Sequence, residues 1–191
     1  LIRGRGEFVA NQPFDDLLHA HFVRSTVAHG EILSIDVDDA RSMPGVVDVY
    51  TSVDLGLEDR PPPMGFYASE AVRPFLARDR VRFVGERVAV VIAETEDQAR
   101  DATDLISIDY AELPAVVMAT DAVKDGAPLV HDEAENNVSF TLRLGNGDET
   151  DAAIKGAHHV TRIKLHNNRL DAMTMEPRGC LGDFDSSTGR L

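Results

Sequence analysis

The sequence predicts an α+β fold, and two observations carry that prediction. Up to about residue 131, short stretches with strand-like alternation and short stretches with helical spacing follow one another closely. Beyond that position, longer alternating stretches dominate, which predicts a domain boundary there and a second region built mainly of strands. For the first region, the residues alone leave an α/β arrangement open as an alternative.

Composition and charge exclude several classes of protein. Of the 191 residues, 43% are hydrophobic and 27% are charged, which is ordinary for a soluble globular protein with a real core. The formal net charge of −14 predicts a surface that repels nucleic acid and anionic lipid. No apolar run approaches the roughly 20 residues that span a bilayer. The single cysteine, Cys180, excludes an intrachain disulfide and fits a reducing cytoplasm.

The first half of the chain shows short elements after an arm of weak periodicity, residues 1–20. Asp38 or Asp39 can cap a short helix that runs through Met43 and is ended by Pro44-Gly45. Strands are expected at residues 21–24, 31–38 and 46–51. The pattern is weak over residues 52–79, where three consecutive prolines, 61–63, predict an extended surface loop.

The clearest structural signal is a strand–helix–strand passage. Residues 81–84 alternate, and the continuous apolar run 88–93 predicts a strand buried on both faces. Thr95 and Gln98 match a capping box, with the Thr95 hydroxyl on the Gln98 amide and the Gln98 side chain returning. A strand follows at 106–110. The predicted helix should bury one face, formed by Ala99, Ala102, Leu105 and Ile106. Truncating Leu105 to Ala should then cost about 2–5 kcal/mol.

The last third predicts a short helix at 120–124, a helix at 150–157 with Thr150 as its cap, and several strands. The strands are expected at 138–144, 158–170 and from 178 to 184. Residues 185–189 are typical of a hairpin turn, and only Arg190 and Leu191 follow Gly189. We therefore expect the sequence to be a piece of a longer chain.

No motif predicts a self-contained active site. Gly4-Arg5-Gly6 lacks the third glycine and the flanking strand and helix of a dinucleotide motif. The aspartates at positions 36, 38 and 39 are similar to the start of a calcium loop, but Arg41 stands where that loop needs glycine. A strand end followed by a helix cap explains these aspartates better.

The remaining candidates for a functional site are the histidines, the cysteine, and the oppositely charged Glu176 and Arg178. His19 and His21 could share one strand face, but a third ligand is missing, and His158 and His159 would face opposite sides. Cys180 is expected to be a small buried side chain. An ion pair within a turn is the favoured interpretation of Glu176 and Arg178. We expect no metal ligand and no catalytic residue here, and cofactor-binding residues stay unassigned.

Four segments in order resemble the front of the large subunit of the molybdenum hydroxylases, the family of xanthine dehydrogenase, aldehyde oxidase and aerobic carbon monoxide dehydrogenase. Their order and spacing over nearly the whole chain carry the resemblance. The segments are residues 22–32, with continuations at 35–36, 40, 44–46 and 49–51; residues 81–91, with 93–95, 98–99, 109–110 and 113–116; residues 126–131; and Met175-Glu176-Pro177-Arg178-Gly179.

The resemblance implies a domain organisation and a chemistry. Residues 1–20 would be an N-terminal arm, 21–131 the α/β hammerhead domain, and 132–191 a connector with the truncated start of the molybdenum-cofactor-binding domain. In this family the subunit holds a molybdopterin cofactor and hydroxylates a heterocycle or aldehyde with water-derived oxygen, or oxidises carbon monoxide. The implied partners are iron–sulfur and flavin subunits or domains, the remainder of the large subunit, and a second copy of the complex.

The resemblance also implies that this stretch alone is inactive and binds no cofactor, because the family's catalytic glutamate and most cofactor loops lie beyond Leu191. The Val84-Gly85-Glu86 turn and the 175–179 motif are expected to be structural. Thr26 stands where the family usually has proline, and the pattern is looser from Thr120. Residues 81–91 are nearer to the bacterial carbon monoxide dehydrogenase-like group than to animal xanthine dehydrogenase.

Two other classes of function compete with this interpretation. One is a non-enzymatic structural or interaction module from a split or truncated gene, for which the loop before residue 79 would supply a docking surface. The other is an independent hydrolase or metalloenzyme, which the missing ligand set and nucleophile constellation disfavour.

Overall fold

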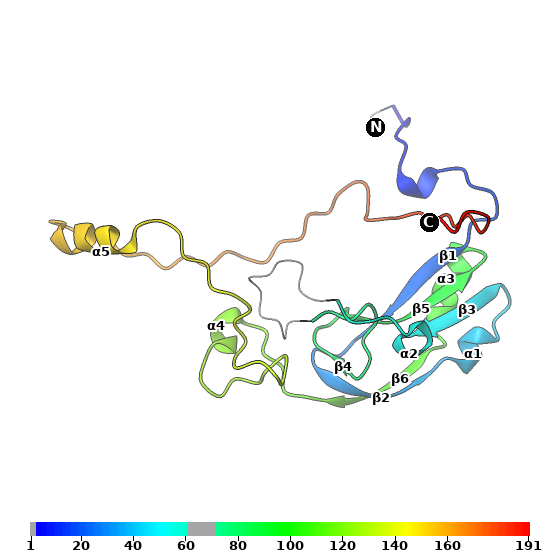
Figure 1. Cartoon of the computed structure of the whole chain (residues 1–191), viewed down its shortest axis with the longest axis horizontal. Coiled ribbons are helices and arrows are strands. Elements are labelled where there is room, and N and C mark those ends of the chain that lie inside the picture. Colours follow the sequence, from blue (N-terminus) through cyan, green and yellow to red (C-terminus); the bar gives the residue numbers. More distant parts are fainter. Residues whose placement is uncertain (1–2, 61–71) are drawn as a thin grey trace. The chain divides into compact units, whose positions relative to one another are not determined.

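The computed structural model describes residues 3–60 and 72–191. The chain divides into two compact units, one of residues Asp16–Arg143 and one of Leu1–Asp15 with Leu144–Leu191 (Figure 1). The first unit holds two antiparallel sheets of three strands each. The proline run at 61–63 lies outside the described residues.

The first sheet is built around β5 (Arg87–Ala93), which lies between β1 (His19–Arg24) and β3 (Val46–Thr51) (Figure 1). Both neighbours are antiparallel to β5, and Ala93 pairs with His19 on one side and Val46 on the other. The predicted burial of this apolar run on both faces is confirmed, because Val88 and Val91, which face opposite sides of the strand, are both fully buried. Four of its side chains are fully buried: Val88, Ala89, Val91 and Ala93.

The second sheet has β2 (Gly30–Asp36) at its centre, between β4 (Arg80–Val81) and β6 (Ser107–Glu112). The strands expected at 31–38 and 106–110 are confirmed with small shifts, whereas the strand expected at 81–84 is only two residues long. The strand–helix–strand order is also confirmed. Because β5 and β6 belong to different sheets, that passage connects the two sheets.

The helix α3 (Glu96–Thr103) begins as the sequence predicts. The Thr95 hydroxyl accepts the Gln98 amide N–H at 3.2 Å. The Gln98 side-chain oxygen accepts a hydrogen bond from the Thr95 hydroxyl group at 2.9 Å. In a capping box it would instead accept one from the Thr95 backbone N–H. Ala99 and Ala102 are fully buried, but the helix ends before Leu105, which is 47% exposed. The prediction that Leu105 belongs to the buried face is therefore wrong.

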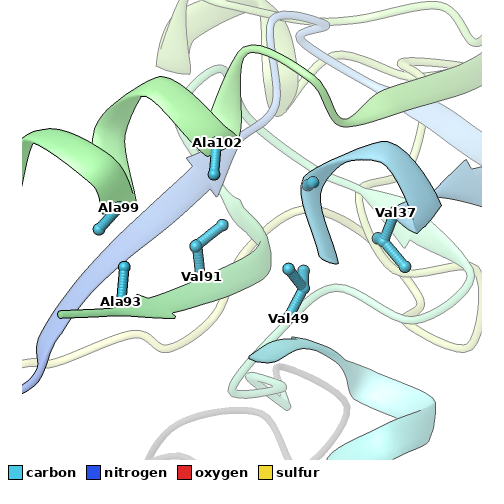
Figure 2. Close-up of a cluster of buried hydrophobic side chains, with 7 residues drawn as sticks. Val37, Val49, Val91, Ala93, Ala99 and Ala102 are labelled. Atoms are coloured by element: carbon cyan, nitrogen blue, oxygen red, sulfur yellow. The ribbon is translucent and has the colours of Figure 1, made fainter. Parts of the chain in front are cut away.

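The main core lies between α3 and the first sheet. Side chains from β3, β5, α3 and the residues around the short helix α1 (Asp38–Arg41) point toward one another (Figure 2). The members of this cluster are Val37, Ala40, Val49, Val91, Ala93, Ala99 and Ala102. Val88 joins a second cluster with Ala77 and Val81. Since alternate residues of a strand face opposite sides, β5 contributes one face to each cluster.

The start of α1 differs from the prediction that Asp38 or Asp39 caps it. Val37 occupies the cap position, and the Asp36 carboxylate accepts the Asp38 backbone N–H at 3.1 Å. Asp38 and Asp39 are the first two helical residues, where their negative charges face the positive end of the helix dipole. The helix ends at Arg41, two residues before the predicted end at Met43, and Gly45 beyond it has a left-handed φ of 84°.

Four further helical elements are short. They are η1 (Val9–Asn11), α2 (Ser52–Leu55), α4 (Ala119–Ala122) and α5 (Gly147–Gly156). The α5 helix begins earlier than predicted, because the Asn146 side chain accepts the Glu149 N–H and Thr150 lies inside the first turn. Within the described ranges, no helix combines the length and the apolar character that crossing a membrane would require.

The strands expected at 138–144, 158–170 and 178–184 are absent, so the prediction of a strand-rich second region is wrong for this structure. Every residue from 141 to 191 is exposed. A strand needs a neighbour for its backbone hydrogen bonds, and the described residues supply none to these segments. The hairpin turn is confirmed, since the Gly189 N–H donates to the Asp185 carbonyl at 2.8 Å. The backbones of Asp185 and Arg190 also form an antiparallel β-bridge.

Candidate functional site

The best-built polar site in the first unit surrounds the tight turn between β4 and β5. Gly85, with a left-handed φ of 92°, donates its backbone N–H to the Ser25 carbonyl at 2.8 Å. Ser25 returns its own N–H to the Glu86 carbonyl at 2.8 Å, and the Arg24 guanidinium donates to the Gly85 carbonyl at 2.9 Å. These bonds fix the turn against the end of β1, which fits the structural role expected for Val84-Gly85-Glu86.

Glu86 is a buried acid at the base of this turn. Its carboxylate accepts the backbone N–H of Arg82 at 2.5 Å. Burial raises the pKa of Glu86 above its ordinary value, and the Arg82 hydrogen bond and the charges of Arg82 and Arg87 oppose that rise. The carboxyl group is therefore held by the backbone of its own turn, and the positive charges of Arg82 and Arg87 act on it.

A cavity of about 380 Å³ opens beside the turn. Its lining contains four arginines: Arg24, Arg73, Arg82 and Arg87. The apolar part of its wall includes Pro74, Phe75, Phe83 and Val130, and His131 and Glu86 complete the titratable groups. Burial lowers the pKa of His131, and the nearby positive charges of Arg82 and Arg80 lower it further.

The arginines that line the cavity differ from other arginines of this unit in their partners. Arg41, Arg78, Arg80 and Arg100 each form an ion pair with an aspartate or glutamate. Across residues 3–60 and 72–191, no ion pair joins a carboxylate to Arg24, Arg73, Arg82 or Arg87. The cavity therefore holds a concentration of positive charge in a chain whose net charge is −14.

The histidine pair noted in the sequence lies on one face of β1. His19 and His21 are both half-buried, at alternate positions of the strand. In the part of the chain that the structure describes, no three or more His, Cys, Asp or Glu side chains gather as metal ligands would. His158 and His159 are exposed and lie outside any strand, and His159 Nε2 is 3.1 Å from the Thr161 hydroxyl.

Two predictions about the last segment are wrong. Cys180 is exposed rather than buried. Glu176 accepts the backbone N–H of Val9 at 3.1 Å, and the described residues show no ion pair between Glu176 and Arg178. Both differences share a cause, since this segment has no packed neighbour that would bury a side chain or exclude water from an ion pair.

The arginine-lined cavity was missed by the sequence reasoning. Its four arginines are spread over three separate stretches of the chain, and only the fold brings them to one wall. One local signal was available, because Arg82 and Arg87 flank the Val84-Gly85-Glu86 turn closely in sequence. Arg24 could not have been added without knowing that β1 pairs with β5 in a register that sets Arg24 opposite Arg87.

Two family models match the chain in succession. The first, described as aldehyde oxidase and xanthine dehydrogenase, a/b hammerhead domain, matches residues 3–114. The second, described as molybdopterin cofactor-binding domain, matches residues 130–191. The first match alone covers more than half of the chain, and it contains both sheets.

Individual relatives agree with these models. The chain is 38% identical to the nicotine 6-hydroxylase large subunit of Paenarthrobacter nicotinovorans, over 100% of this chain and 24% of the relative. It is 31% identical to the carbon monoxide dehydrogenase large chain of Hydrogenophaga pseudoflava, over 100% of this chain and 25% of the relative. The crystal structure of quinoline 2-oxidoreductase from Pseudomonas putida 86 matches 72% of this chain and 18% of its own, with a TM-score of 0.65 and 36% identity. The chain thus spans about a quarter or less of these relatives.

Proposed function

The chain belongs to the aldehyde oxidase and xanthine dehydrogenase family, and we propose that it is the N-terminal part of the molybdopterin-binding catalytic subunit of a molybdenum hydroxylase. The observation that carries the proposal is the order of the two family matches, the hammerhead domain at 3–114 followed by the cofactor-binding domain at 130–191. Relatives named as large subunits or large chains of such enzymes support it along the whole chain.

The proposed reaction replaces a C–H bond of the substrate by a C–OH bond. The oxygen comes from water, and two electrons and two protons leave the substrate and water together. The electrons pass to an acceptor outside this chain, for which we propose iron–sulfur and flavin partners. Further proposed contacts are the remainder of the large subunit and a second copy of the complex, and a cytoplasmic location is supported by the single unpaired cysteine.

The molybdenum cofactor would supply the redox chemistry, but the described residues of this chain do not by themselves form a site for it. Residues 141–191, most of the cofactor-domain match, are exposed throughout and enclose no side chain. We therefore propose that the stretch is inactive alone and contributes scaffold to a site completed by other residues. The proposed division is an arm at 1–20, the hammerhead domain at 21–131 and the start of the cofactor domain at 132–191.

We propose a nitrogen heterocycle as the substrate. The relative acting on nicotine and the structure acting on quinoline are 38% and 36% identical to this chain, against 31% for the carbon monoxide dehydrogenase of Hydrogenophaga pseudoflava. The expectation drawn from residues 81–91 set the carbon monoxide dehydrogenase-like group against animal xanthine dehydrogenase, and it stays a prediction. Carbon monoxide is the second candidate substrate.

The test is to capture the protein, with an antibody against residues 16–143, from the cells that make it. We expect a polypeptide heavier than 20.9 kDa with molybdenum and an extractable pterin in equal amounts. We also expect dye reduction with a pyridine or quinoline substrate. A polypeptide of 20.9 kDa without molybdenum would overturn the proposal and support a non-enzymatic docking module. Dye reduction with carbon monoxide alone would overturn only the substrate assignment.

A further inference from the structure

The cavity beside the Gly85 turn carries an unneutralised positive charge that the proposed function does not use. Arg24 and Arg87 are directly opposed on the neighbouring strands β1 and β5. Like charges placed opposite each other on paired strands are destabilising. No described carboxylate forms an ion pair with either guanidinium, and only the charge of the nearby Glu86 carboxylate acts against the repulsion at Arg87.

The guanidinium groups are held in place by contacts that leave most of their donors free. Arg24 uses one donor on the Gly85 carbonyl, and Arg82 uses one on the Arg80 carbonyl at 3.3 Å. The Arg87 guanidinium carbon lies 5.6 Å from the centre of the Phe22 ring, a cation–π distance. A guanidinium has five N–H donors, so each group can still bind an oxyanion bidentately.

One of these donors is already withdrawn from water. The Arg82 Nε is buried and has no hydrogen-bond partner among the described residues. Buried donors in folded proteins nearly always have a partner, because an unmade hydrogen bond in the interior is costly. Because Nε has no exposed surface, a ligand oxygen in the cavity would reach it only after the Arg82 side chain moves.

The acids around the cavity offset only part of its positive charge. The Glu86 carboxylate is engaged by the Arg82 backbone N–H. Asp132 and Asp59 are paired with arginines outside this cavity, Arg80 at 2.9 Å and Arg78 at 3.4 Å. Asp79 and Glu133 line an adjoining hollow that shares Arg82 and His131 with the cavity. The cavity lining itself has four arginines against one glutamate.

The remaining wall defines the other half of the ligand. Phe83 is 57% exposed and, with Pro74 and Val130, offers an apolar surface beside the arginines. Arg60 already covers the Phe75 ring at 4.7 Å, so Phe83 is the accessible aromatic face. The cavity volume of about 380 Å³ falls within the usual range for small-molecule sites, about 300–1,000 Å³.

We propose that this cavity binds a small organic oxyanion, a carboxylate or phosphate ester attached to an aromatic or apolar body. The oxyanion would lie against Arg24, Arg82 and Arg87, with the charge of Arg73 at the same cavity, and the body against Phe83. The site is formed entirely by residues of the first unit, so the proposal holds whether or not the chain belongs to a catalytic subunit.

The test is a titration of the 191-residue chain, followed by amide chemical shifts, with three matched probes: benzoate, phenyl phosphate and neutral benzamide. We expect the two anions to shift resonances at the Gly85 turn, and benzamide to bind at least tenfold more weakly. Whichever anion binds more tightly identifies the oxyanion as carboxylate or phosphate. Binding of benzamide as tight as that of both anions, or no shift with either anion, would overturn the proposal.

Variants separate binding from folding. Arg73→Gln is the first, because the exposed Arg73 side chain supports no strand, and it should weaken the better anion several-fold. Arg24→Gln with Arg82→Gln should weaken it at least tenfold, in a chain whose amide spectrum shows that it is folded. Arg100→Gln, which alters an ion-paired arginine on α3, is the control and should leave affinity unchanged. Equal losses for Arg73→Gln and Arg100→Gln would contradict the site.

Discussion

Glu86 shows how one buried carboxyl group couples the stability of this fold to pH. Burial raises its folded-state pKa above the ordinary value of 4.5. The folded state then holds the proton more tightly than the unfolded chain does. The contribution of Glu86 to stability is therefore largest below pH 4.5 and declines as pH rises through its folded pKa.

Replacing Glu86 by Gln should flatten this dependence. The amide oxygen can still accept the Arg82 N–H, so the variant loses the ionisation and keeps the bond. We expect the free energy of unfolding of the variant to increase relative to that of the unaltered chain as the pH rises from 4 to 7. Urea denaturation at several pH values measures it.

Asp132 supplies the contrast for that experiment, because its pKa is lowered, first by its hydrogen bond with Arg80. A lowered pKa stabilises the fold above the ordinary value of 3.8 and loses that effect as pH falls through the folded pKa. Asp132→Asn should therefore change relative stability with pH in the opposite direction to Glu86→Gln. The same sign for both variants would show that Glu86 is not the desolvated group inferred here.

The burial of Val91 and Leu105 predicts which of two truncations to alanine costs more stability. Val91 of β5 is fully buried in the cluster that it shares with Ala99 and Ala102 of α3, whereas Leu105 is 47% exposed. Val91→Ala should cost about 1.5–3 kcal/mol, since it removes two buried methyl groups and leaves a cavity. Leu105→Ala should cost about 1 kcal/mol or less, below the 2–5 kcal/mol that the sequence predicts for a buried position. Thermal denaturation of the two variants should place Leu105→Ala nearer to the unaltered chain, and the reverse order would contradict the described core.

At the scale of single elements, α3 depends on Thr95, the residue that caps its N-terminus. The Thr95 hydroxyl accepts the Gln98 N–H and donates to the Gln98 side chain. Thr95→Ala removes both bonds and should destabilise the chain by about 0.5–2 kcal/mol. Thr95→Ser keeps the hydroxyl and should cost much less. Equal costs for the two variants, measured by urea denaturation, would mean that the threonine methyl group, and not the cap, supports the helix.

The elements that the sequence predicts well are those whose signals are local. The β5 strand and the cap of α3 each depend on residues within a few positions of one another, and both are confirmed. The end of α3 was misjudged because Leu105 continues the helical spacing, yet the backbone turns after Thr103 to start β6. Spacing records which face a residue would take in a helix, not where the helix stops.

The failures share a dependence on distant residues. Alternation at 158–170 and 178–184 indicates strands, but a strand forms only where another strand accepts its hydrogen bonds. The arginine cavity also depends on distant residues, because β1 and β5 must pair before Arg24 and Arg87 meet. Neither the pairing of these strands nor the pairing of β1 with β5 can be predicted from a few consecutive residues. The family resemblance did predict the hammerhead domain, because it draws on whole folds rather than on local spacing.

For the whole molecule, the two units differ in what holds them together. The unit of Asp16–Arg143 contains both sheets and both buried clusters. In the other unit all residues from 144 to 191 are exposed, and α5 has ten residues and a single capping side chain. Isolated helices shorter than about 12–15 residues are marginal in water. The free energy of folding must therefore come almost entirely from the first unit.

Limited proteolysis tests this asymmetry. Trypsin should first cut the exposed basic sites after residue 140 and leave a resistant fragment ending near Arg143; these sites are Arg143, Lys155, Arg162, Lys164, Arg169, Arg178 and Arg190. Trypsin suits the question because Arg60 and Arg73 each precede a proline, which blocks cleavage there. Mass spectrometry of the fragments over time identifies the order. Early cutting at Arg87, inside β5, would contradict the division. If the proposed cofactor domain is completed by further chain, the same sites should become protected in the longer protein, because residues 158–170 would then have strands to pair with.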